Sequence, residues 1–335
     1  MIYRIDPLTD TRWAELVERH PLSTIFHTPA WLSALHRTYG FEPLVLTSSP
    51  PGNPLANGVP FCLVRSALTG RRLVSLPFSD HCQPLAFPEE FRLILDAALE
   101  SYRCDRLSYV ELRPFDTIPN GNGFSSSQQY IFHMLDLRPS IEAIMAECHT
   151  DCVLRKIRRA GREELVVESG CSDALLSDFY ALQVITRRRH GYPPQPREWF
   201  KNLIDAVGEN ATVRVARASG RPVAAILMLR HKHTEVYKYG CSISEDHNLG
   251  GMQLLLWTAI EDAKAAGMEE MDLGRSGLQD TGLIQYKDRW GAQKRELAYY
   301  RYPATSRPTT SKSLFSKFPR PVLVLMGRLL YRHMA

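Results

Sequence analysis

The chain has 335 residues, enough for two ordinary domains. Hydrophobic residues make up 44% and charged residues 23%, the balance of a folded globular protein. No apolar run approaches the roughly 20 residues that span a bilayer, and the N-terminus carries acids where a signal peptide has an apolar core. Seven scattered cysteines indicate reduced thiols, so we expect a cytoplasmic protein.

The net charge of +5 is concentrated at the C-terminal end of the sequence. Residues 305–335 contain six Lys and Arg and no acid, whereas the rest of the chain is close to neutral. This distribution argues against a body that binds nucleic acid through general basicity. We therefore treat 305–335 as a separate basic, amphipathic tail.

Apolar periodicity and turn residues predict the elements of the first half. Helices are expected at 10–19, 29–39 and 89–103, and strands at 43–47, 59–65, 72–76, 107–113 and 130–137. The helix at 29–39 has the clearest start, because Thr28 is a favourable N-cap and Pro29 suits the first helical position.

The second half repeats this order of elements. Helices are expected at 172–190, 197–207 and 251–266, and strands at 212–218, 222–231, 234–240, 269–273 and 296–302. Five of the starts recur 162 to 166 residues after their counterparts, although residue identities do not repeat. An antiparallel meander, a strand, a Gly-rich turn, a helix and a further strand follow one another in the acyl-CoA-dependent N-acetyltransferase fold. We therefore predict an α/β (α+β) chain of two tandem GNAT-like domains with mixed, mostly antiparallel sheets, bounded at 1–150 and 151–304.

The turn before the helix at 251–266 is a candidate donor site. Gly250 and Gly251 permit close backbone approach, and the helix start offers N–H groups and a positive dipole end to a pyrophosphate. The first half has Glu89 and Glu90 in the corresponding place, which would repel an anion. Only the second half is thus equipped for a phosphate-bearing donor. An ordinary glycine-bearing helix start is the alternative.

Polar residues around the end of the strand at 269–273 are candidates for substrate binding. The strand ends in Gly-Arg-Ser, and a predicted loop then brings Tyr286, Lys287, Arg289 and Trp290. A lysine there would balance the negative charge of a tetrahedral intermediate or hold a phosphate. The alternative is that Lys287 and Arg289 lie on a solvent-exposed face and that Trp290 fills the space at a hinge.

The series Y-x-Y-G, N-x-x-x-x-x-x-L-L-W-x-x-I, D-x-G-R-S and Y-K-x-R-W-G-A resembles the second domain of the Fem family. These tandem acetyltransferase-fold enzymes add amino acids from aminoacyl-tRNA to peptidoglycan precursors. The resemblance covers about 25–303 and is closest to the branch found beside exosortase and exopolysaccharide genes. It implies that Tyr286 and Lys287 fall on an aromatic–lysine pair implicated in catalysis. The long coiled-coil arm of some Fem ligases is absent from this sequence.

Together these patterns assign roles to individual residues. The catalytic candidates are Lys287 and Tyr286. The donor-binding candidates are Asn248, Gly250, Gly251 and Tyr239. The substrate-binding candidates are Arg275, Ser276, Arg289 and Trp290, with Asp80 and His81 on the acceptor side in the first domain. The basic cluster that we expect to meet phosphates is Arg155, Lys156, Arg158 and Arg159, unless it is a solvated helix face. Cys148, His149 and Cys152 lack a second ligand pair, so no metal site is expected.

The sequence thus predicts an acyltransferase that acts on an amine of a cell-envelope or exopolysaccharide precursor. The amine would attack the acyl carbonyl directly, because no activated Ser or Cys is evident. No permanently bound cofactor is expected, and acyl-CoA or aminoacyl-tRNA is the co-substrate. A non-catalytic scaffold that binds a polysaccharide or lipid-linked precursor remains the alternative. The tail at 305–335 lies either on the inner face of the membrane or on the body of the protein.

Overall fold

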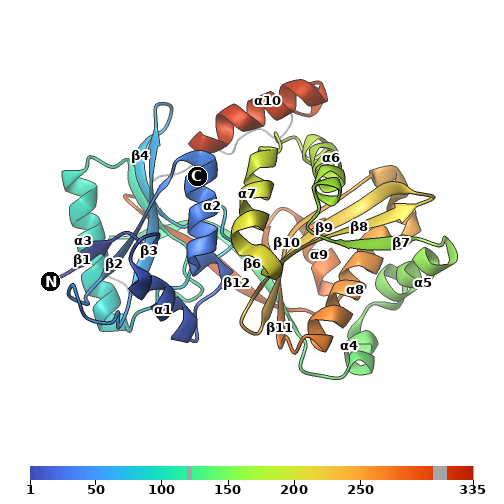
Figure 1. Cartoon of the computed structure of the whole chain (residues 1–335), viewed down its shortest axis with the longest axis horizontal. Coiled ribbons are helices and arrows are strands. Elements are labelled where there is room, and N and C mark those ends of the chain that lie inside the picture. Colours follow the sequence, from blue (N-terminus) through green and yellow to red (C-terminus); the bar gives the residue numbers. More distant parts are fainter. Residues whose placement is uncertain (119–122, 305–314, 335) are drawn as a thin grey trace. The chain divides into compact units, whose positions relative to one another are not determined.

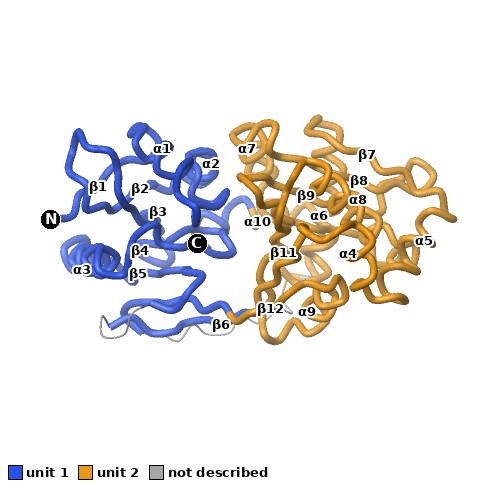
Figure 2. The backbone as a smooth tube through the Cα atoms, turned by 90° about the horizontal axis from the view of Figure 1, so that it is seen from below, with its two compact units in different colours: residues 1–130, 297–309, 328–335 blue, residues 131–296, 310–327 orange. Residues whose placement is uncertain are grey.

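A computed structural model describes residues 1–118, 123–304 and 315–334 (Figure 1). The chain divides into two compact units (Figure 2). Unit 1 comprises residues 1–130, 297–309 and 328–335, and unit 2 comprises residues 131–296 and 310–327. The division differs from the boundaries expected from the sequence, because β6 (Ser125–Asp136) and β12 (Gln293–Tyr302) each begin in one unit and end in the other.

Unit 1 contains a mostly antiparallel sheet in the order β1-β2-β3-β4-β5-β12-β6. Its other strands are β1 (Tyr3–Ile5), β2 (Glu42–Thr47), β3 (Val59–Ser66), β4 (Gly70–Ser75) and β5 (Tyr109–Leu112). Only β4 and β5 run parallel among the recorded pairs. The helices α1 (Thr11–Arg19) and α2 (Pro29–Tyr39) lie on one side of these strands and α3 (Pro88–Cys104) on the other (Figure 1).

The helices of unit 1 start where the sequence predicts them. The Thr28 hydroxyl accepts a hydrogen bond from the Trp31 amide (3.2 Å) and Pro29 occupies the first position of α2. Trp31 is fully buried, so the predicted apolar face is the one that packs. On α3 the spacing of Phe91, Ile94, Leu95 and Ala98 likewise forms a buried stripe that covers the sheet.

Unit 2 repeats this plan in the order β6-β11-β10-β9-β8-β7. Its strands are β7 (Val166–Gly170), β8 (Ala211–Ala218), β9 (Arg221–His231), β10 (Thr234–Ser242) and β11 (Glu270–Gly277). Its helices are α4 (Ile141–Glu147), α5 (Arg155–Arg162), α6 (Asp173–Arg189), α7 (Arg197–Val207), α8 (Gly251–Ala265) and α9 (Thr281–Asp288). Leu255, Leu256 and Ile260 of α8 pack against β9, so this helix forms the centre of the unit's core.

The predicted fold class is confirmed. The sequence did not reveal β1, α4 and β7, and two of the predicted assignments differ from the structure. The loop expected between 274 and 293 contains the helix α9, whose glycine and weak amphipathicity hide it from periodicity. The last strands of the two halves are also exchanged. β12 comes at the end of the second half, but it pairs with β5 through Tyr300–Tyr302, and β6 neighbours β11. Local apolar periodicity cannot predict this exchange, because it shows where a strand lies and not which strand it pairs with.

The tail contains one helix, α10 (Arg320–Leu330), and residues 305–314 lie outside the described part of the chain. Leu323 is fully buried, and a Cβ atom on Gly327 would lie 1.9 Å from the carbonyl oxygen of Pro194. Tyr331 is buried too, and its ring lies 5.7 Å from that of Phe78. One face of the helix therefore packs against the protein. This agrees with one of the two alternatives for the tail, in which it lies on the body of the protein. No helix among the described residues is long and apolar enough to cross a membrane.

Candidate functional site

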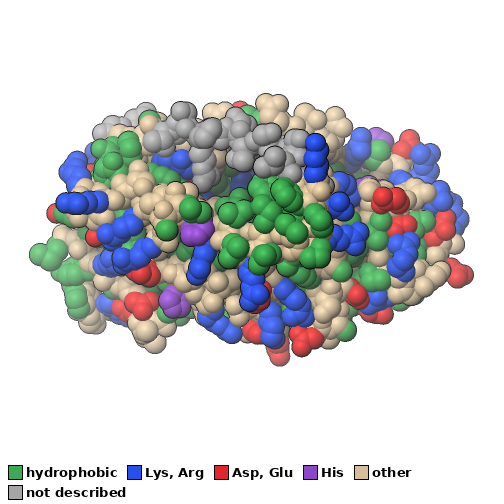
Figure 3. Space-filling view, turned by 90° about the horizontal axis from the view of Figure 1, so that it is seen from above, with side chains coloured by type: hydrophobic (Ala, Val, Ile, Leu, Met, Phe, Trp, Pro, Cys, Tyr) green, Lys and Arg blue, Asp and Glu red, His purple; other side chains and the backbone are tan. Residues whose placement is uncertain are grey.

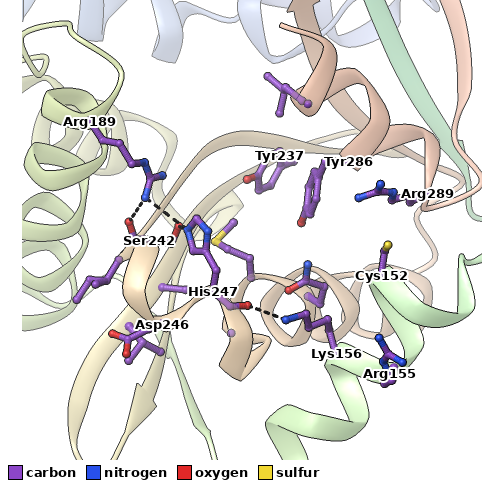
Figure 4. Close-up of a pocket in the computed structure, with 18 of the residues that line it drawn as sticks. Cys152, Arg155, Lys156, Arg189, Tyr237, Ser242, Asp246, His247, Tyr286 and Arg289 are labelled. Carbon is purple, nitrogen blue, oxygen red and sulfur yellow. Dashed lines mark hydrogen bonds between the residues drawn. The ribbon is translucent and has the colours of Figure 1, made fainter.

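Two neighbouring strands of unit 2 separate at the centre of its sheet. β10 and β11 pair in parallel only from Thr234–Val236 to Glu270–Asp272, although β10 continues to Ser242 and β11 to Gly277. A cavity of about 560 Å³ opens beyond the last pair, lined by β9, β10, α5, α8 and α9 (Figure 4). This volume is in the range of small-molecule sites.

The N-terminus of α8 faces this cavity. Gly251, Met252 and Gln253 line it, and no side chain caps the helix. The first amides of a helix have no partner within the helix, and together they carry a partial positive charge. Gly251 thus lies where the sequence places the donor.

Gly250 has a different role from the one expected. It adopts a left-handed conformation (φ +83°), and a Cβ atom there would lie 2.2 Å from the carbonyl oxygen of Lys156. This glycine therefore allows α5 to approach the start of α8, and it does not line the cavity. The Lys156 ammonium reinforces this contact through the carbonyls of His247 and Asn248 (3.3 Å each), which places a positive charge beside the helix N-terminus.

The cavity wall is electropositive. Its cations are Arg155, Lys156, Arg189 and Arg289. Its two carboxylates are already paired with arginines, Asp151 with Arg155 (3.3 Å) and Asp246 with Arg221 (2.7 Å). An anionic ligand is therefore favoured near the uncapped helix end. Of the basic cluster predicted on α5, Arg158 and Arg159 do not line the cavity, and Arg159 pairs with Glu163 instead (3.0 Å).

Two tyrosines lie at the opposite side of the cavity. Tyr286 projects from α9 and Tyr237 from β10 (Figure 4). Burial raises the pKa of both hydroxyls, and the Trp290 indole offsets this for Tyr286 only in part. Both therefore stay protonated at neutral pH and can donate a hydrogen bond. The structure thus places Tyr286 at the cavity, as its predicted role requires.

A polar group that the sequence did not reveal lies at the mouth of the cavity. The Ser242 hydroxyl is 2.8 Å from His247 Nε2, and Arg189 Nη1 lies 3.4 Å from the same nitrogen (Figure 4). Partial burial and then Arg189 lower the pKa of His247. Its imidazole is therefore neutral at pH 7 and able to accept a proton. The sequence singled out only the HNLGG segment of this group, because the serine and the arginine come from β10 and α6.

Lys287 does not lie in a polar loop, as the sequence had suggested. It is on α9 and only 3% exposed. Its ammonium donates hydrogen bonds to the carbonyls of Gly274 (2.9 Å) and Arg275 (3.2 Å), on the part of β11 that has left β10. It does not line the cavity. This lysine holds α9 against β11, and with it the position of Tyr286.

Most of the other predicted site residues do not line the cavity. A β-bulge at Tyr237–Tyr239 turns Tyr239 to the α7 side, where its hydroxyl accepts a hydrogen bond from Trp199 Nε1 (2.9 Å). Trp290 is fully buried in the core and Ser276 is 2% exposed. Asn248 contributes its carbonyl to Lys156. Of the predicted substrate-binding residues, Arg289 lines the cavity and Arg275 does not.

His81 of unit 1 is buried, and Asp80 beside it is half-buried. His81 is 3% exposed, with ring contacts to Phe26 (5.3 Å) and Phe115 (4.5 Å). The Asp80 carbonyl accepts a hydrogen bond from the Tyr299 hydroxyl (2.7 Å). No group of three or more His, Cys, Asp and Glu side chains within 1–118, 123–304 and 315–334 is arranged to hold a metal ion.

The geometry agrees with the comparisons to known proteins. Residues 152–288, within unit 2, match a family model described as an acetyltransferase (GNAT) domain. The chain has the GNAT acetyltransferase fold. No curated protein sequence matches it significantly.

Solved structures extend the likeness to both units. A structure of FemX matches with a TM-score of 0.70 and 14% identity, over 90% of this chain and 97% of that one. The L-PGS of Bacillus licheniformis matches with a TM-score of 0.54 and 14% identity, over 98% of both chains. A tandem GNAT protein from the clavulanic acid biosynthesis pathway matches with a TM-score of 0.57 and 13% identity, over 92% of this chain and 99% of that one. At these identities the matches show a shared tandem fold.

Proposed function

We propose that this protein transfers an acyl group from a phosphate-bearing carrier to an amine, and that the unit 2 cavity binds the donor. One observation carries the proposal. The strands β10 and β11 separate beside an uncapped helix N-terminus and the basic residues Lys156 and Arg189. A carrier phosphate at the helix end would leave the acyl group free to extend through the cavity toward Tyr237 and Tyr286.

The side chains at the cavity fit direct transfer. His247 Nε2 takes the proton of the attacking amine, whose nitrogen then bonds to the acyl carbon. The bond from that carbon to the carrier sulfur or oxygen breaks, and the Tyr286 hydroxyl donates a hydrogen bond to the leaving atom, which takes a proton from solvent while His247 releases its own. Lys287 acts as a positioning residue for Tyr286 in this scheme, so its predicted importance is kept and its role is changed.

Two donors share the required chemistry, acyl-CoA and aminoacyl-tRNA, because both attach the acyl group to a phosphate-bearing carrier. The acceptor we propose is an amine of a cell-envelope or exopolysaccharide precursor, on the strength of the Fem-like motifs in 239–293. The match to the GNAT domain model supports acyl-CoA. The fold shared with FemX is compatible with the other donor.

Donor binding is tested by thermal shift with acetyl-CoA and, separately, with an aminoacyl-tRNA. At about 100 times the Kd, a ligand stabilises the folded protein by about 2.7 kcal/mol, which is several degrees in melting temperature. We expect Lys156→Gln to reduce the shift, because it removes a cation beside the helix end. Arg159→Gln is the matched control, since Arg159 lies on the same helix and does not line the cavity.

The outcomes separate the alternatives. A shift with acetyl-CoA alone assigns an acyl-CoA donor, and a shift with aminoacyl-tRNA alone assigns aminoacyl transfer. Binding without turnover of any amine would favour a scaffold. Equal loss in Lys156→Gln and Arg159→Gln, or no shift with either donor, would contradict a donor site in this cavity.

A further inference from the structure

The helix α10 is apolar on two opposite faces. Leu323 and Gly327 are spaced by four residues and are buried, and so is Tyr331, which directly follows the helix. Val322, Leu325 and Leu329 form a second stripe at helical spacing and are 40%, 57% and 56% exposed. A docked surface helix normally presents polar side chains to water, so the second stripe needs a separate explanation.

Exposed apolar side chains are concentrated on this segment. Four of the thirteen large hydrophobic side chains exposed in the described chain fall within 322–334, the three above and Met334. Figure 3 shows this face of the molecule, where green side chains gather in the middle, over α10, with Lys and Arg side chains to the right of them and below them. The patch is therefore continuous rather than a scatter of single residues.

The contact at Gly327 fixes which way the patch faces. A Cβ atom there would lie 1.9 Å from the Pro194 carbonyl oxygen, so the helix backbone rests directly on the loop before α7. Leu323 is fully buried one turn earlier. The helix cannot rotate to bury the Leu325 stripe without losing both contacts. Its apolar face is thus held outward.

The charged side chains of the tail itself have one sign. Arg328 follows Leu325 by three positions and therefore flanks it on the helix surface, and the exposed Arg332 comes just after the helix ends. At the other end Arg320 lines a second cavity of about 510 Å³ together with Arg188 and Arg189, although Glu245 lies there too. Residues 305–335 contain no acid. An apolar stripe within a basic border matches the headgroup region of an anionic bilayer.

We propose that α10 is a membrane-docking surface that inserts Val322, Leu325 and Leu329 shallowly into an anionic lipid bilayer. The arginines at its border contact lipid phosphates, while Leu323 and Gly327 keep the helix attached to the body. The two alternatives for the tail then hold together. One face of α10 packs on the body of the protein, and the opposite face contacts the membrane. This docking is independent of the reaction proposed for unit 2.

Vesicle co-sedimentation of the full chain tests the proposal. We expect binding to vesicles of phosphatidylcholine mixed with phosphatidylglycerol, loss of binding in high salt, and little binding to phosphatidylcholine alone. Leu325→Ser with Leu329→Ser should weaken binding at least tenfold, and Arg328→Gln with Arg332→Gln on the order of tenfold, since each basic residue contributes about one kcal/mol. Neither pair should lower the melting temperature, because these side chains face outward.

Leu93→Ser is the matched control, because Leu93 is 53% exposed on α3 and lies outside the patch. It should bind vesicles like the unchanged protein. Failure of the full chain to bind anionic vesicles would overturn the proposal. So would equal binding by the Leu325→Ser, Leu329→Ser variant. Light scattering adds a further outcome, since a dimer that this variant converts to a monomer would assign the patch to a second copy of the chain.

Discussion

The two units contain the same succession of strands and helix, but only one of them opens. In unit 1, β5 pairs with β4 along its entire length, from Tyr109 to Leu112, and β12 pairs on its other side. In unit 2, only three of the eight residues of β11 pair with β10. The fold therefore provides the place for a cavity, and the pairing of two strands decides whether the cavity forms.

The helix that connects the two strands, α3 in unit 1 and α8 in unit 2, also differs between the units at its N-terminus. In unit 1, α3 begins with Pro88, which lacks an N–H group, and the Glu90 carboxylate accepts a hydrogen bond from the Phe87 amide (3.2 Å). In unit 2, α8 begins with Gly251 and has no side-chain cap. A carboxylate thus occupies in unit 1 the position that an anionic ligand would take in unit 2.

Unit 1 uses its central strand for a buried ion cluster. Glu111 of β5 pairs with Arg113 (2.8 Å) and with Arg301 of β12, and all three side chains are at most 8% exposed. Arg301 also lies over the Tyr109 ring (4.0 Å). Burial alone would raise the pKa of Glu111, but the two guanidinium groups outweigh it and lower that pKa to about 2. The cluster fixes β12 against β5.

The largest effect is expected from breaking this cluster. Glu111→Gln removes the carboxylate that pairs with two buried arginines, and breaking a buried pair in this way typically costs about 3–5 kcal/mol. Urea unfolding of the full chain measures the loss. Glu42→Gln is the control, because Glu42 forms an exposed pair with Arg65 that is worth at most about 1 kcal/mol.

The pH dependence gives a second criterion for Glu111. Its folded pKa of about 2 lies below the unfolded value of about 4.3, so its contribution is present above pH 4.3 and is lost as the pH falls toward 2. The stability difference between the unchanged protein and Glu111→Gln should shrink over that window. A difference that is constant from pH 7 to pH 3 would show that the cluster is not what stabilises unit 1.

The next largest effect compares the two histidines that precede α3 and α8. His247 lies at the cavity mouth, whereas His81 is buried between two phenylalanine rings. His247→Gln should reduce kcat/KM on the order of a hundredfold and leave the melting temperature unchanged. His81→Gln should leave kcat/KM unchanged and lower the free energy of unfolding by about 1–2 kcal/mol, because its ring contacts are lost.

The pH–rate profile identifies the base. Because the pKa of His247 is lowered, the unchanged enzyme should keep its kcat/KM down to about pH 6.5 and lose it only at lower pH. This acidic decline should disappear in His247→Gln. An unchanged decline would assign proton removal to another group.

The sequence revealed the fold well and the site only in part. Helices and strands follow from local periodicity, and the meander order was sufficient to predict two acetyltransferase-like units. The site residues depend on features that periodicity does not contain. Lys287 was expected in a loop because α9 is short and only weakly amphipathic. Ser242, His247 and Arg189 belong to three elements that only the tertiary structure brings together.

The tyrosines of β10 show the same limit within a single strand. In a regular strand Tyr237 and Tyr239 would share a face, and the sequence offers no sign that they do not. The bulge between them separates them, with Tyr237 at the cavity and Tyr239 bonded to Trp199. The recorded pairing of β3 with β4 in unit 1 has no such shift.

The smallest expected effects come from removing these two hydroxyl groups. Tyr239→Phe leaves the Trp199 indole without its acceptor and should cost about 1–2 kcal/mol of stability, with no change in donor affinity. Tyr237→Phe should leave stability within about 0.5 kcal/mol and weaken donor binding a few-fold, because its hydroxyl belongs to the cavity wall. Urea unfolding and donor titration of both variants measure the pair. If both lowered donor affinity equally, the bulge would not divide the strand between scaffold and site. The separation of β10 from β11 would then position the donor without help from the bulge. The two units would differ at the donor site in the N-termini of α3 and α8 alone.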